Sequence, residues 1–146
     1  ELVVLADRPV DHAPDRQADE PRRLAQIAAA IGRTFSVPVL ERVAGEDVGE
    51  SLTSLLRAEI VREVARYPEL ECTFTHGLLR EAALSTLTST RKRALYADIA
   101  KAFEELYANS LDEHLERLAH YHAQAGALPK ALEYAERARA TTTGGV

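Results

Sequence analysis

The sequence predicts a mostly helical chain that contains one small β-hairpin. Across most of the chain, apolar residues recur at the spacing that places them on one face of a helix. Residues 60–65 and 71–75 instead alternate between apolar and polar side chains, as half-buried strands do. The dipeptide Tyr67-Pro68 interrupts the pattern between these two segments and marks the turn of an antiparallel hairpin.

The first helix is predicted to follow a polar segment. Residues 1–19 contain two prolines and show no hydrophobic period, so they are expected to be a linker or the end of an upstream domain. The helix then begins after Asp19 or Glu20, with Pro21 in its first turn, and Gly32 ends it.

Two shorter helices are predicted before the hairpin. Ser36 is a suitable cap for a helix over residues 37–44, and Gly45 is suited to end it. A third helix is expected from about Asp47 to Ala58. Helices followed by a two-stranded wing give the element order of a winged-helix domain, which we assign to residues 20–87.

The hydrophobic period changes inside residues 71–87, so the second strand is predicted to lead directly into a fourth helix. Thr75 stands where its side chain can cap that helix, and His76 lies at the junction. Free amide groups and the positive end of the helix dipole converge at such a junction. The position therefore favours a bound anion.

Residues 88–146 are expected to form antiparallel helices. Ser89 or Thr90 can cap a long helix that reaches Leu106. The segment after it shares the small and apolar positions of a 34-residue tetratricopeptide repeat, at Leu115, Leu118, Ala119, Gly126, Ala131 and Ala138. The match is partial, because His122 and Ala135 stand where that repeat has aromatic residues.

Two segments resemble the winged-helix region of bacterial STAND ATPases, which are NB-ARC-like signal-transduction ATPases. This class includes large LuxR-type transcriptional regulators and multidomain adenylate cyclases. Residues 75–83, THGLLREAA, resemble its run of phenylalanine-any-histidine-alanine-leucine-leucine-arginine-glutamate-alanine, and AAAIGRTFSVPVLERVAG resembles the start of the same region. The first segment is also similar to the methionine-histidine-aspartate motif of nucleotide-binding immune receptors, although Gly77 replaces the aspartate.

This resemblance implies a regulatory segment of a larger bacterial protein. In the intact parent, His76, with Thr75 beside it, would contact the β-phosphate of ADP held by an upstream nucleotide-binding domain of the same chain. A protein or small-molecule inducer would bind the repeat surface. ADP or ATP would be the parent's cofactor, and the segment itself is expected to need none.

Composition limits the classes of partner. The chain has 18 Lys and Arg against 23 Asp and Glu, and the net charge of −5 argues against nucleic acid or an anionic membrane as the direct partner. Its one cysteine, Cys72, allows no intramolecular disulfide and no thiolate metal cluster, which fits a cytoplasmic setting. No apolar run approaches the roughly 18 residues that a bilayer requires.

No catalytic or metal site is predicted. The chain lacks a GxxxxGK[ST] phosphate loop and a Gly-x-Ser-x-Gly elbow, so no enzyme is expected. His120 and His122 would point about 200° apart on a helix, which prevents joint binding of one metal ion. The basic run Arg91-Lys92-Arg93, with Arg80 nearby, is expected to be solvated surface or to pair with acidic side chains, and phosphate or nucleic-acid contact is the alternative.

Two other functions stay open. One is a DNA-binding winged helix with a helical dimerisation tail, and the other is a plain helical-repeat scaffold. The expected reading helix carries Arg57 as its basic residue against Asp47, Glu50 and Glu59, which disfavours DNA. Arg62 and Arg66 on the wing weaken this argument against DNA binding, because they add positive charge.

Overall fold

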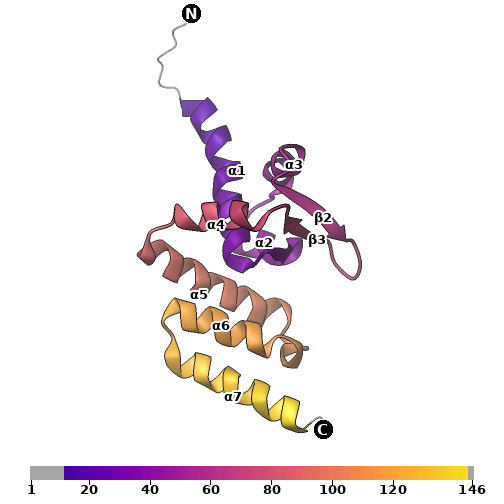
Figure 1. Ribbon diagram of the computed structural model, residues 1–146, viewed down its shortest axis with the longest axis vertical. Coiled ribbons are helices and arrows are strands. Elements are labelled where there is room, and N and C mark those ends of the chain that lie inside the picture. Colours follow the sequence, from indigo (N-terminus) through magenta and orange to yellow (C-terminus); the bar gives the residue numbers. More distant parts are fainter. Residues whose placement is uncertain (1–11, 145–146) are drawn as a thin grey trace, which may run out of the picture.

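The structure is a computed structural model that describes the backbone of residues 12–144 and the side chains of residues 20–141. Figure 1 shows two parts, a helical stack formed by α5, α6 and α7 and, above it, a unit formed by α1 to α4 with a small sheet. Residues 1–11 of the expected linker lie outside the described residues. The described chain is mostly helical, with one three-stranded antiparallel sheet.

Helix α1 (His12–Ile31) is longer than the sequence indicated. It begins at His12 and not after Asp19 or Glu20, so residues 12–19 belong to the helix, and Pro21 lies inside it. These residues carry no apolar stripe, and the hydrophobic period therefore could not assign them to a helix.

The C-terminal half of α1 is the centre of the core. Ala28, Ala29 and Ala30 are fully buried, and their small side chains allow neighbouring helices to approach closely. The helices that pack most extensively on α1 are α2 (Val37–Ala44), α3 (Gly49–Arg57), α4 (Gly77–Ser85) and α5 (Ser89–Leu106).

The sheet has three strands in the order β1-β3-β2, comprising β1 (Thr34–Ser36), β2 (Val61–Ala65) and β3 (Glu71–Phe74). The antiparallel hairpin of β2 and β3 confirms the prediction, whereas β1 was not predicted. Phe35 of β1 lies opposite Cys72 of β3, and the rings of Phe35 and Phe74 pack with their centroids 5.8 Å apart. This pairing covers the outer edge of β3 and makes it the central strand.

Local capping explains where the short helices begin and end. As predicted, the Ser36 hydroxyl accepts a hydrogen bond from the Val39 amide at the start of α2, and Gly45 ends the helix with a φ of 76°. Helix α3 begins later than expected, because the Asp47 carboxylate accepts a hydrogen bond from the Gly49 amide at 2.9 Å. Helix α5 is capped by Thr88 and not by Ser89 or Thr90.

The C-terminal half continues from α5 through a 3₁₀ turn (Leu111–Glu113) to α6 (Leu115–Ala125) and α7 (Leu128–Gly144). Figure 1 shows α5, α6 and α7 side by side, each running opposite to its neighbour. Gly126, with a φ of 87°, makes the turn between α6 and α7. Among residues 12–144, no helix has both the length and the apolar character needed to cross a bilayer.

Candidate functional site

The candidate site is the junction where β3 ends and α4 begins. Thr75 does not cap α4, contrary to the prediction. Its hydroxyl instead donates hydrogen bonds to the backbone carbonyls of Glu59 at 2.8 Å and Ile60 at 3.2 Å. Its amide also donates to the Ile60 carbonyl, at 3.0 Å. Thr75 thus ties the end of β3 to the segment that precedes β2.

His76 is the N-cap residue of α4. Its backbone is extended, with φ −137° and ψ 140°, and its carbonyl accepts a hydrogen bond from the Leu79 amide at 3.0 Å. Its ring is exposed, and within the described residues it has no hydrogen bond, ion pair or ring contact. The imidazole is therefore presented to solvent with both nitrogen atoms available.

The first turn of α4 offers free backbone donors beside this ring. No side chain caps the helix, and the first amides of a helix have no intrahelical acceptor. Leu78, in the same turn, is 77% exposed.

The junction is held firmly against α1. Arg80 of α4 donates from Nε to the Ala29 carbonyl at 2.8 Å. On the strand side, the Thr73 hydroxyl donates to the Arg33 carbonyl at 3.1 Å, and Phe74 donates its amide to the same carbonyl at 2.9 Å. His76 therefore stands on a rigid base, with the β-sheet on one side and α1 on the other.

The other histidines do not converge. His114 stacks on Tyr107 with ring centroids 4.1 Å apart, whereas His120 makes an edge contact with Tyr96. Nε2 of His122 lies 3.0 Å from a carboxylate oxygen of Glu104. The described residues contain no cluster of three or more side chains that could hold a metal ion.

Cys72 is buried in the central strand. Burial, and then the negative charge of Glu63, raise the pKa of its thiol. A buried thiol with a raised pKa is a poor nucleophile. The geometry therefore gives Cys72 a packing role.

The basic run divides between different surroundings. Arg80 is directed to the Ala29 carbonyl and does not join a solvent-facing patch. Arg91 and Arg93 are exposed, and Lys92 is half-buried. The side chains of these three residues have no salt bridge to any residue in the described part of the chain.

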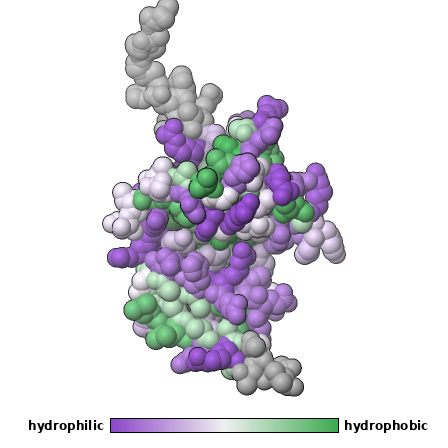
Figure 2. All heavy atoms as spheres, in the orientation of Figure 1, coloured by the Kyte–Doolittle hydropathy of each residue, from purple (hydrophilic) through white to green (hydrophobic). Residues whose placement is uncertain are grey.

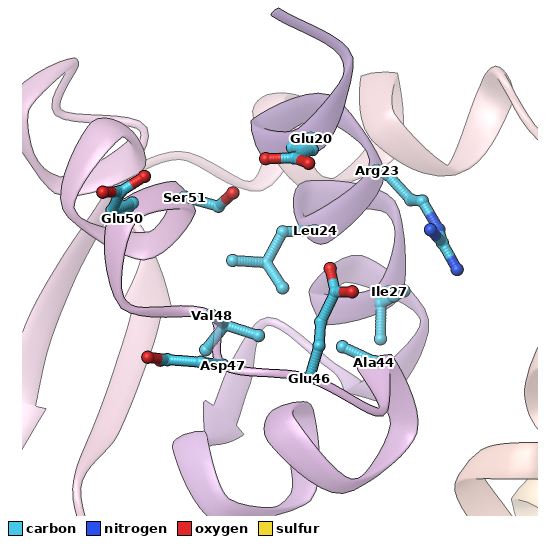
Figure 3. Close-up of a pocket in the computed structure, with 10 residues that line it drawn as sticks. All are labelled: Glu20, Arg23, Leu24, Ile27, Ala44, Glu46, Asp47, Val48, Glu50 and Ser51. Atoms are coloured by element: carbon cyan, nitrogen blue, oxygen red, sulfur yellow. The ribbon is translucent and has the colours of Figure 1, made fainter. Parts of the chain in front are cut away.

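Two surface features were not predicted. A cleft of about 250 Å³ lies between α1 and the α2–α3 connection, and in Figure 3 Glu20 and Glu46 flank Leu24 at its mouth while Arg23 points away. On α7, Leu128 and Leu132 are 60% and 63% exposed, and Figure 2 shows apolar residues gathered at that lower edge of the molecule. The elements that line the cleft are far apart in the sequence, so no local pattern could have indicated it.

Comparison with known proteins gives no match: no family model, no curated protein and no solved structure corresponds to this chain.

Proposed function

We propose that this chain is a non-catalytic regulatory and interaction segment of a multidomain signal-transduction ATPase of the STAND class, in which His76 contacts a phosphate of bound ADP. The observation that carries the proposal is the exposed His76 ring at the start of α4, which has no partner within the described residues. A nucleotide domain of the same parent chain would dock against this junction and supply the phosphate.

The arrangement of elements supports a winged helix in residues 20–87. The order helix, strand, helix, helix, strand, strand, with β1 paired beside β3, is typical of winged-helix domains. The antiparallel stack of α5, α6 and α7 supports a tetratricopeptide-like region in residues 88–146. Of the small positions of that repeat, Ala131 is buried, and Ala119 and Ala138 are partly buried.

The proposed contact would act as a switch. A hydrogen bond from the His76 imidazole to a phosphate oxygen is charge-assisted, and such bonds contribute about 1.5–3 kcal/mol. That amount biases an equilibrium between closed and open forms without fixing it. Thr75 would contribute by holding the junction in place, since its hydroxyl already bonds to Glu59 and Ile60.

The test is ADP retention by the intact parent protein carrying His76→Ala. Retention is expected to fall, or basal signalling to rise, while the free energy of unfolding stays unchanged because the ring is exposed. His120→Ala is the matched control, since it removes a second exposed histidine from a different helix. Unchanged nucleotide retention and activity in His76→Ala would defeat the role of His76.

The coding sequence upstream of Glu1 provides an independent check on the parent. A GxxxxGK[ST] motif after a predicted strand is expected there, because that loop binds the nucleotide phosphates. An upstream sequence without such a motif would contradict an ATPase parent, whatever the His76 experiment shows.

A second candidate is a DNA-binding winged helix, which the exposed Arg62 and Arg66 favour. The surface of α3 opposes it. Glu50 is exposed, and the hydroxyls of Thr53 and Ser54 donate to carbonyls of their own helix, at 2.8 and 3.2 Å. Side chains that bond to their own backbone are less available to read base edges.

A further inference from the structure

A second cleft, of about 230 Å³, lies between α1, α2 and the first turns of α5. It is formed where the sheet-containing unit meets the helical stack. The hydrogen bond from Nε2 of Gln26 to the Thr86 hydroxyl, 2.7 Å long, joins α1 to the α4–α5 connection beside it. A ligand in this cleft would therefore contact both parts of the molecule at once.

Two arginines from different helices line the cleft, Arg23 of α1 and Arg91 of α5. Both are exposed, and neither has an ion pair with any side chain in residues 20–141. In Figure 3 the Arg23 side chain extends away from Leu24 and Glu20, and among the described residues no ion pair joins Arg23 to Glu20 or Glu46. Asp98 is the acidic group among the residues that line the cleft. The charged groups of the cleft thus favour an anion.

The position of Arg91 strengthens this preference. It lies in the first turn of α5, where its own amide donates to the Thr88 hydroxyl at 3.1 Å. A positive side chain at this end of a helix is opposed by the helix dipole, which favours negative charge there. An anion in the cleft would offset the positive charge of Arg91 and the positive end of the helix dipole.

The rest of the lining is mainly apolar, although Gln26 and Thr90 contribute polar groups. Ile27 is buried at the base, and Val43, Leu87 and Leu95 are partly buried around it. An inorganic ion would leave this surface uncovered, whereas a ligand with an apolar body would cover it and gain free energy in proportion to the area removed from water.

We propose that the cleft between α1 and the start of α5 binds a small organic anion, with its carboxylate, phosphate or sulfonate group at Arg23 and Arg91 and its apolar body over Ile27 and Leu95. The proposal goes beyond the function assigned to His76 and requires neither that residue nor a nucleotide. Because the ligand would contact the sheet-containing unit and the helical stack together, its binding would favour the arrangement of the two that forms the cleft.

The test is a fluorescence titration of the 146-residue chain with 8-anilinonaphthalene-1-sulfonate, which joins an apolar body to one anionic group. N-Phenyl-1-naphthylamine, which has the same rings without the sulfonate, is the matched probe. Saturable binding of the sulfonate is expected to weaken about fivefold or more in the Arg23→Gln/Arg91→Gln double variant, the size of the effect that exposed charge pairs produce. The affinity of the uncharged probe should change by less than about twofold in the double variant, because this probe forms no charge pair with either arginine.

Arg93→Gln is the control variant, because Arg93 belongs to the same basic run but does not line the cleft. The proposal is overturned if the sulfonate does not bind saturably, if Arg93→Gln weakens it as much as the double variant, or if both probes weaken equally. Competition with inorganic phosphate tests the role of the apolar lining separately from that of the two arginines. Displacement of the sulfonate by phosphate alone, at equal affinity, would overturn the role of the apolar lining.

Discussion

Nε2 of His122 lies 3.0 Å from Oε2 of Glu104, across the interface between α6 and α5. The same carboxylate oxygen accepts a hydrogen bond from the Tyr134 hydroxyl of α7 at 2.8 Å, so one glutamate joins three helices. The rings of His122 and Tyr134 stack with centroids 5.5 Å apart, and Nζ of Lys130 lies 4.0 Å from the carboxylate. We call these four residues the Glu104 cluster.

Replacing Glu104 with alanine is expected to lower the free energy of unfolding by about 1–3 kcal/mol, because the Tyr134 hydroxyl would lose its acceptor in a largely buried position. Urea denaturation followed by circular dichroism measures the change. Glu105→Ala is the control. Its carboxylate pairs with Arg42 at 2.8 Å on an exposed surface, and loss of such a pair costs about 0.2–1 kcal/mol. Equal losses of unfolding free energy in the two variants would show that the Glu104 cluster stabilises the fold no more than an exposed ion pair does.

The same carboxylate predicts a pH dependence. Burial acts to raise the pKa of Glu104, but hydrogen bonds from Tyr134 and His122 and the positive charges of His122 and Lys130 outweigh it, and the pKa lies below its ordinary value. A depressed pKa in the folded state contributes stability above the pKa of the unfolded carboxyl, about 4.3, which is lost as the pH falls through the folded pKa. The stability advantage of the native chain over Glu104→Gln should thus shrink as the pH falls below about 4. An advantage that stays constant or grows below that pH would contradict this assignment.

Tyr121→Phe tests how the two parts of the molecule are joined. The Tyr121 hydroxyl, on α6, donates to the Ile31 carbonyl at the end of α1 at 2.5 Å, and the tyrosine is 1% exposed. Removing the hydroxyl leaves a buried carbonyl without this donor, at a cost of about 1–3 kcal/mol. Tyr67→Phe is the matched control, since Tyr67 is 90% exposed and its change should leave stability unaltered. Equal denaturation midpoints in the two variants would contradict a stabilising role for the hydrogen bond from Tyr121 to Ile31.

The sequence could predict elements whose signals are local. The strands β2 and β3 alternate in polarity on either side of Tyr67-Pro68, and the period changes at His76, so the hairpin and the exposed junction could both be foreseen. Strand β1 has three residues, too few to show an alternation, and it exists because its backbone pairs with β3.

Features that depend on tertiary contacts could not be predicted in this way. Thr75 is an acceptable cap by local rules, but the carbonyl of Glu59 competes for its hydroxyl and is brought near by the hairpin. Arg23 and Arg91 line one cleft although they lie on helices far apart in the sequence. No pattern within either helix indicates that the two residues share it.

Random duplex DNA is expected not to bind this chain, even at low ionic strength. The net charge is −5, and the exposed surface of α3 includes Glu50. Fluorescence anisotropy with a labelled duplex measures the interaction. Micromolar binding that weakens with added salt, and that Arg62→Gln/Arg66→Gln abolishes, would favour the DNA-binding alternative.

The reactivity of Cys72 should report on the opening of the sheet. The residue is 1% exposed, and burial and the charge of Glu63 raise the pKa of its thiol, so the reactive thiolate is scarce in the folded state. An opening that costs about 3 kcal/mol would slow reaction with a disulfide reagent roughly 150-fold relative to the urea-unfolded chain. Tyr121→Phe should speed that reaction if the sheet and the helical stack open together, because the variant destabilises their junction without touching Cys72. A native thiol that reacts at the unfolded rate would show that β3 is not held between β1 and β2, and an unchanged rate in Tyr121→Phe would show that the sheet opens by itself.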